Sequence, residues 1–212
     1  MPSYLIAADY RLLTDNLLDL SHETYLHTRT IGNEAVADTP VTTNTDRRCV
    51  YVQKKIAECP PPPFYQFLGR LPADARVRRW QRTRFEPPGY TVIDVGVESL
   101  DAVPGSNRVA GRVINLITPA SATSSHYFWA FARNFRLNEF EVTDFLCKNV
   151  RRTFDEDKEM LEAQQANLGT QAVDPRYKLV IKNDTAPLQA RRVLESMLAA
   201  QDNRAKQQDA HA

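Results

Sequence analysis

The sequence predicts an α+β domain in which helices pack on a curved antiparallel sheet, and three observations lead to this fold class. A helix-spaced apolar pattern follows a short apolar segment at the start of the chain. Four strand-like segments, separated by proline and glycine, follow between about residues 75 and 135. Helical patterns return after that. Helices, then a meander of strands, then helices again are typical of the α+β class.

The first part of the chain combines a short strand, a helix and a long loop. Residues 4–8 are apolar and predict a strand. A helix is expected from Asp9 to about His27, because four apolar residues recur at helical spacing: Tyr10, Leu13, Leu17 and Leu20. Residues 28–46 are rich in Thr, Asn, Asp and Pro, which predicts a long surface loop. Alternation over residues 48–52 predicts the next strand.

The predicted meander has four strands, at residues 78–85, 90–97, 108–116 and 124–131. The last of these has apolar residues on both faces, so it is expected to be central and covered on both sides. Its aromatic residues Phe128 and Trp129 are candidates for the roof of a pocket.

Two helices are predicted after the meander. Thr153 and Glu156 have the spacing of a capping box, and Gly169 is a plausible stop. Pro187 is expected to open a last helix. Residues 1–200 therefore form one predicted domain, and the polar residues 201–212 a disordered tail.

Composition excludes several classes of protein. Of 212 residues, 42% are hydrophobic and 25% charged, and no apolar run approaches a membrane span. The net charge is 27 − 26 = +1, without a basic stripe, which argues against nucleic acid as a partner. No basic segment precedes an apolar core at the start, so the chain is expected in the cytoplasm. Three cysteines without a Cys-x-x-Cys pair exclude a finger-type zinc site and fit a reducing compartment.

A first candidate for chemistry is the segment Asp19-x2-His22-x4-His27. On a regular helix the two imidazoles would diverge, so they meet only if the helix ends or bulges near them. Two histidines and a carboxylate that accepts an imidazole N–H would suit a metal site with an orienting partner. The alternative is two ordinary histidines near a helix end.

The second candidate is Asp157. With Asp155 and Glu156 it is expected in the first turn of a helix, where acidic residues complement the dipole. Its spacing from Phe154 and Leu161, however, places it on the apolar face. A buried carboxylate needs a cation or strong donors, and with two histidines it would complete a facial triad for iron.

These segments resemble the Rieske non-haem iron oxygenases, and vanillate-type O-demethylases most of all. The resemblance rests on the Asp-x2-His-x4-His motif within residues 8–27 and on three further stretches, at residues 79–88, 117–135 and 154–165. It covers about residues 4–200. The resemblance implies a helix-grip fold, as in START-like and Bet v 1-like proteins.

The resemblance also implies roles for residues. His22, His27 and Asp157 match the ligands of a mononuclear Fe(II), and Asp19 matches an aspartate that passes electrons from a neighbouring Rieske cluster. His126 matches a substrate-pocket position, although a hydrogen-bonded core histidine explains it equally well. Asp94 is a weaker pocket candidate.

By the same resemblance, the chain is expected to be the catalytic domain of a monooxygenase that demethylates a methoxylated aromatic acid with O2. Its expected partners are a Rieske-bearing chain and a ferredoxin or flavin reductase, within a homotrimer. No Cys-x-His or Cys-x-x-His pair exists, so no [2Fe–2S] cluster is expected in this chain. The chain would be either a truncated product or a domain supplied with electrons in trans. The alternatives are a non-catalytic aromatic-ligand-binding domain and a zinc hydrolase with Glu23 beside the ligands.

Overall fold

The computed structural model describes residues 3–32, 34–103, 105–169 and 182–209. One antiparallel sheet of seven strands dominates the fold, in the order β1-β7-β6-β5-β4-β3-β2. Its strands are β1 (Ser3–Ile6), β2 (Thr42–Asp46), β3 (Cys49–Cys59), β4 (Val77–Glu86), β5 (Tyr90–Ser99), β6 (Arg108–Ser121) and β7 (Ser124–Arg133). The predicted α+β class and curved antiparallel sheet are confirmed.

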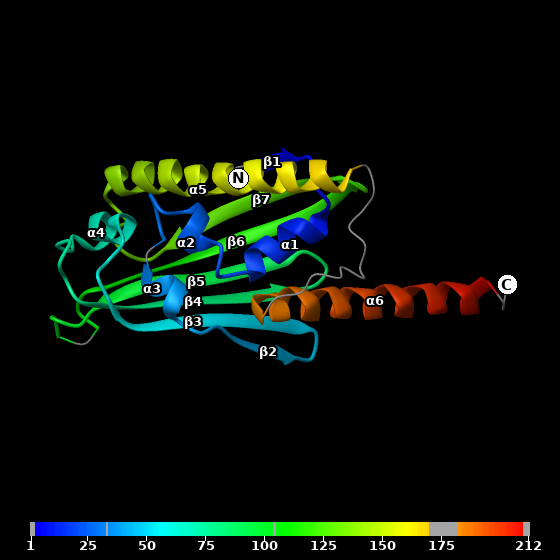
Figure 1. Cartoon of the computed structure of the whole chain (residues 1–212), viewed down its shortest axis with the longest axis horizontal. Coiled ribbons are helices and arrows are strands. Elements are labelled where there is room, and N and C mark those ends of the chain that lie inside the picture. The colour runs from blue at the N-terminus through cyan, green and yellow to red at the C-terminus, as the bar shows by residue number, and fades with distance from the viewer. Residues whose placement is uncertain (1–2, 33, 104, 170–181, 210–212) are drawn as a thin grey trace.

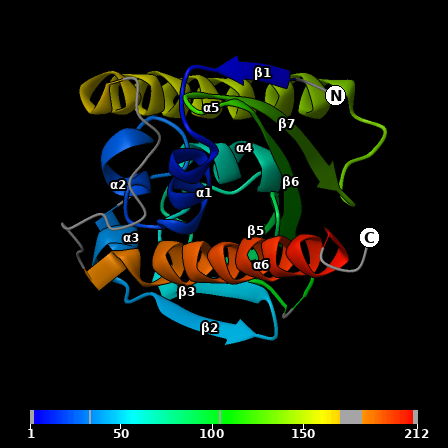
Figure 2. The ribbon, with the colours of Figure 1, turned by 90° about the vertical axis from the view of Figure 1, so that its right-hand side faces the viewer.

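The helices gather on one face of the sheet (Figure 1). They are α1 (Tyr10–Leu18), α2 (Glu23–Leu26), α3 (Glu34–Asp38), α4 (Pro63–Gly69), α5 (Phe140–Leu168) and α6 (Thr185–Asp209). In Figure 2 the sheet curves from β1 to β2 around α1, with α5 along one margin and α6 along the other. This is the helix grip that the resemblance implied. No helix among the described residues is long and apolar enough to cross a membrane.

Alternation along the strands separates an inner face from an outer face. On β4, Arg79, Gln81 and Phe85 are buried under the helices, whereas Arg78 and Arg82 are exposed on the other side. A one-residue shift in register would exchange these two sets. The inner face and the helices enclose the main apolar core, and a smaller cluster lies where α6 covers β3.

Several predicted elements differ from the structure. The expected loop at residues 28–46 contains α3 and β2. The strand at 124–131, which is β7, is second from the edge rather than central, and no described helix covers its outer face. The prediction was wrong because apolar residues occur on both faces of β7, and one of them, Phe128, lies on the uncovered outer face.

The predicted start of the second helix was wrong. Helix α5 begins at Phe140, and the Thr153 hydroxyl donates to the carbonyl oxygen of Asn149 within the helix (3.1 Å) instead of capping it. Apolar residues upstream of Thr153 continue the buried stripe, so nothing starts the helix there. Its end at Gly169 is confirmed, with a φ of 76° that favours glycine.

The last helix also extends beyond the prediction. Helix α6 begins at Thr185, two residues before Pro187, and continues to Asp209. Residues 201–209 are therefore helical rather than a disordered tail. Residues 210–212 lie outside the described part of the chain.

Candidate metal centre

The segment with the two histidines begins where α1 ends. Asp19 has an extended backbone (φ −88°, ψ 106°), and its carboxylate accepts hydrogen bonds from the amide (2.7 Å) and hydroxyl (2.5 Å) of Ser21. The chain therefore leaves the helical path after Leu18. The four-residue helix α2 follows, with His22 at its N-terminal cap and His27 at its C-terminal cap.

This break brings the two imidazoles together. Their ring centroids lie 5.1 Å apart in an edge-on arrangement. The single helix predicted from Asp9 to His27 was wrong, but the expectation that the imidazoles meet only where the helix is interrupted is consistent with this geometry. His27 is 1% exposed, and His22 is partly exposed.

Asp157 reaches the same point from α5. The buried residues of α5 follow a spacing of three or four, namely Val142, Leu146, Val150, Phe154, Asp157, Leu161 and Gln165. Asp157 thus occupies a position in an apolar stripe. Its Oδ1 lies 3.2 Å from Nε2 of His27 and 3.6 Å from Nε2 of His22. The three residues offer ligand atoms within 4.8 Å of one another.

An unsatisfied carboxylate oxygen marks the middle of this cluster. Asp157 is 6% exposed, and its buried Oδ1 has no hydrogen-bond partner among the described residues. A buried carboxylate oxygen without a donor is costly unless a cation binds it. Two imidazole nitrogens and one carboxylate are the donor set of a facial triad for non-haem iron, so the residues present fit a bound Fe(II).

Each imidazole is oriented by an acceptor at its other nitrogen. Nδ1 of His22 donates to the backbone oxygen of Asp19 (2.6 Å), and Nδ1 of His27 lies 2.9 Å from Oε2 of Glu156. With the Nδ1 proton held this way, the Nε2 lone pairs face Asp157. The prediction that the Asp19 carboxylate orients an imidazole was wrong, because that carboxylate is bound to Ser21.

The site favours positive charge. Burial alone lowers the pKa of His27, but the carboxylates of Asp157 and Glu156 outweigh burial, and the pKa is raised above its ordinary value. Sequence reasoning missed Glu156 as a partner of His27, because its spacing places it beside the apolar stripe rather than on it.

Two buried cations from the sheet hold the histidine segment in place. Arg79 of β4 donates to Oε2 of Glu23 (3.0 Å) and to the carbonyl oxygen of Ile31 (2.7 Å). Lys54 of β3 donates to the carbonyl oxygens of Leu20 (3.3 Å) and Val36 (2.5 Å). Burial lowers the pKa of Lys54. The backbone on both sides of α2 is therefore tied to the inner face of the sheet.

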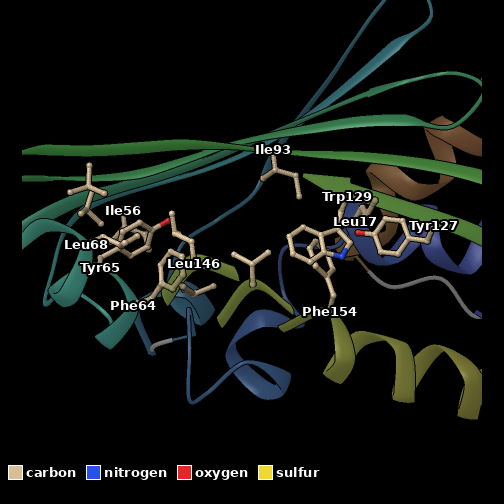
Figure 3. Packing of buried hydrophobic residues seen from close by; sticks show 14 of the residues in the cluster. Leu17, Ile56, Phe64, Tyr65, Leu68, Ile93, Tyr127, Trp129, Leu146 and Phe154 are labelled. Atoms are coloured by element: carbon tan, nitrogen blue, oxygen red, sulfur yellow. The ribbon is translucent and has the colours of Figure 1, made fainter. Parts of the chain in front are cut away.

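A cavity lies beside the three candidate ligands. In Figure 3, the Ile93 side chain points from the sheet toward the helices. It lies between two groups of aromatic side chains, one around Phe154 and the other around Phe64. Most of the lining is apolar and includes Leu17, Phe64, Ile93, Val95, Val113, Phe131, Val150 and Phe154. The polar lining residues outside the triad are Asn16, Asp19, Glu23, Tyr65, Arg79, Gln81 and Thr153. An apolar chamber with a few polar groups suits a small aromatic ligand.

Comparison with known proteins identifies the family. The protein family described as "Vanillate O-demethylase oxygenase C-terminal domain" matches residues 6–200. The chain belongs to this family. It is 40% identical over 210 residues to the vanillate O-demethylase oxygenase subunit of Pseudomonas sp. (strain HR199 / DSM 7063), covering 95% of this chain and 58% of that protein. A second such subunit, from Pseudomonas sp. (strain ATCC 19151), is 38% identical over 93% of this chain and 62% of its own length.

Solved structures agree on the fold of this vanillate O-demethylase-type C-terminal domain. Dicamba monooxygenase bound to 3,6-dichlorosalicylic acid superposes with a TM-score of 0.83 at 22% identity, over 93% of this chain and 58% of that one. The chain thus spans roughly three-fifths of the relatives that it matches.

The structure does not bring the two expected pocket residues of this domain to the cavity. His126 is exposed on the outer face of β7, opposite Leu5 of β1. Asp94 lies on the outer face of β5, where it accepts a hydrogen bond from Nε1 of Trp80 (2.5 Å). Strand alternation explains both placements, because Tyr127 and Ile93 take the neighbouring inward positions.

The expected aromatic roof is also placed differently. Phe128 is on the outer face, and Trp129 is buried against Phe154, with ring centroids 5.1 Å apart, rather than lining the cavity. Phe64 and Phe131 supply aromatic lining instead. Asp19 does line the cavity, and it also lines a second depression between α1 and α6.

Proposed function

We propose that this chain is the catalytic domain of a monooxygenase that removes the methyl group of a methoxylated aromatic acid. In this proposal His22, His27 and Asp157 bind one ferrous ion. The single observation that carries it is the buried, unpaired Oδ1 of Asp157 facing two oriented imidazoles beside an apolar cavity. The family and its vanillate-demethylating relatives support the substrate class.

The bound iron would supply the activation of O2. The balanced reaction consumes the methyl ether, O2, two electrons and two protons, and yields a phenol, formaldehyde and water. The chain's own residues position the reactants: the apolar walls from Ile93 to Phe154 hold the ring and exclude water, and Glu156 keeps the His27 lone pair directed at the metal.

The electrons must come from elsewhere. The proposal assigns them to a Rieske-bearing chain that receives them from a ferredoxin or flavin reductase, within a cytoplasmic homotrimer. Asp19 is the proposed entry point, as the family resemblance implies. Its backbone oxygen contacts the His22 ring, and the residue is partly exposed.

A hydrolytic role for the same ligands is not favoured. A zinc hydrolase would need a free general base near the metal, and Glu23 is the adjacent carboxylate. Glu23 is 2% exposed and paired with Arg79 at 3.0 Å. A carboxylate already engaged in a buried ion pair is not the free general base that such a reaction needs.

Iron loading combined with a peroxide assay tests the proposal on this chain alone. Hydrogen peroxide has the composition of O2 with two electrons and two protons, so it replaces both O2 and the electron supply. We expect one Fe(II) per chain, and formaldehyde released when vanillate and peroxide are added. His22→Ala and His27→Ala should lose both the iron and the formaldehyde.

Zinc-loaded chain is the matched control and should release no formaldehyde. Undiminished iron in both histidine variants would contradict the proposed metal site. Full iron loading without any formaldehyde would contradict the proposed reaction while leaving the metal site intact.

A further inference from the structure

The sheet wall of the cavity carries a side-chain amide that has no hydrogen-bond partner among the described residues. Gln81 of β4 is 8% exposed and lines the cavity. Across the described chain, its side chain makes no hydrogen bond, whereas Glu23 pairs with Arg79 and Thr153 bonds to Asn149. A ligand in the cavity would supply the missing partner.

Gln81 lies on the sheet wall of the same cavity that the candidate metal ligands line from the helix layer. It comes from the sheet, whereas His22, His27 and Asp157 come from α2 and α5 in the helix layer. A substrate whose methoxy group faces the metal ligands can therefore present a second substituent to Gln81. In vanillate the carboxylate is meta to the methoxy group, whereas the hydroxyl is adjacent to it.

Two buried cations of the sheet lie beside Gln81 and favour an acidic substituent. Lys54 of β3 is the direct cross-strand neighbour of Gln81, and Arg79 follows two residues away on the same inner face. Glu23 balances one of these two cations. Lys54 donates to backbone carbonyls and forms no direct ion pair among the described residues, although the charges of Glu23 and Asp19 act on it.

We infer that Gln81 is a specificity-determining residue that donates an amide hydrogen bond to the acidic group of an aromatic acid substrate. This inference rests on the proposed function. The amide orients the ring so that the methyl ether faces the metal ligands. Hydrogen bonds to charged acceptors are about twice as strong as neutral ones, which suits a group that sets orientation.

Ligand binding provides a test that does not depend on turnover. Vanillate and its carboxyl-free analogue 2-methoxyphenol are titrated calorimetrically into the iron-loaded chain under anaerobic conditions. Gln81→Met keeps the length of the side chain and removes the donor. We expect vanillate to bind roughly ten- to hundredfold more weakly to this variant, and 2-methoxyphenol to bind with unchanged affinity.

Gln53→Met is the matched control. Gln53 lies on the adjacent strand β3, on the opposite face, and is not a lining residue of the cavity. This variant should bind both ligands like the wild type, and unfolding midpoints of all variants report whether they fold.

The outcomes separate the inference from the proposed function. If the wild type binds vanillate and Gln81→Met binds it equally well, the inference fails alone. If Gln81→Met weakens both ligands equally, Gln81 contributes packing rather than recognition of the acid, and the inference also fails. If the wild type binds neither ligand, the proposed substrate class fails, and the inference with it.

Discussion

The two segments that supply the candidate metal ligands are built differently. Asp157 belongs to a 29-residue helix whose buried stripe recurs every three or four residues, so its placement follows from helical geometry. His22 and His27 flank a four-residue helix that contributes few hydrogen bonds of its own. That segment is held by buried cations reaching from the sheet. One ligand is thus positioned by local periodicity, and two are positioned by tertiary contacts.

Removing the ligand that the regular helix supplies should have the largest effect. Asp157→Asn keeps the size of the side chain but removes the charge that faces both imidazoles, so we expect most of the iron affinity to be lost. At iron concentrations 100 times the dissociation constant, binding stabilises a protein by about 2.7 kcal/mol. We expect this iron-induced stabilisation in the wild type and almost none in the variant, measured by unfolding with and without iron.

Asp155→Asn is the control for that experiment. Asp155 lies two residues away on the same helix, and its Oδ1 accepts a hydrogen bond from the Tyr4 hydroxyl (2.8 Å). An asparagine oxygen can still accept that bond, so iron binding should persist. Equal iron retention in the two variants would leave only the two histidines, which are too few for a facial triad.

The irregular segment should instead be sensitive to the buried cation beneath it. Arg79→Met leaves Glu23 buried without a partner and the Ile31 carbonyl without its donor. Breaking a buried ion pair by removing one partner costs about 3–5 kcal/mol, and we expect a loss of that size in urea unfolding. Because replacing both members of such a pair by apolar residues of similar volume is often close to neutral, Arg79→Met combined with Glu23→Met should recover much of it.

Arg78→Met serves as the comparison on the same strand. Arg78 pairs with Glu98 on the exposed outer face (3.2 Å), and surface pairs contribute at most about 1 kcal/mol. Equal destabilisation by the two arginine variants would show that the segment is not held by charge.

The same contrast explains what could be predicted from the sequence. The four strands of the meander, the buried face of Asp157 and the end of α5 at Gly169 follow from local periodicity and turn residues, and the structure has them. The start of α5 was misplaced because Thr153 has the spacing of a cap, although the apolar stripe continues upstream of it.

Features that depend on tertiary contacts were not predictable. Whether His126 and Asp94 point to the inner or the outer face depends on which alternate residues of each strand point inward. Apolar residues on both faces of these strands leave that choice open. Lys54 and Arg79 would be expected on the surface from their charge, and only the sheet register shows that they lie beneath the histidine segment. The convergence of His22 and His27 required a break at Asp19 that the helical spacing of the leucines concealed.

The smallest expected effect concerns the orientation of one imidazole. The acceptor for His22 is a backbone oxygen of its own segment, whereas the acceptor for His27 is Glu156 of α5. The regular helix therefore supplies both a ligand and the group that orients a ligand of the irregular segment. Removing partners of this kind costs about 10–100-fold in metal affinity, so Glu156→Ala should weaken iron binding by that amount without abolishing it.

Glu159→Ala is the matched variant, since Glu159 is exposed on the same helix. Iron affinity measured by competition with a chelator should fall for Glu156→Ala and stay at the wild-type value for Glu159→Ala. The reduced affinity should also distinguish orientation from ligation, because Asp157→Asn loses far more. If Glu156→Ala binds iron as tightly as the wild type, the burial of His27 alone fixes its ring. The irregular segment would then position its imidazoles without help from α5.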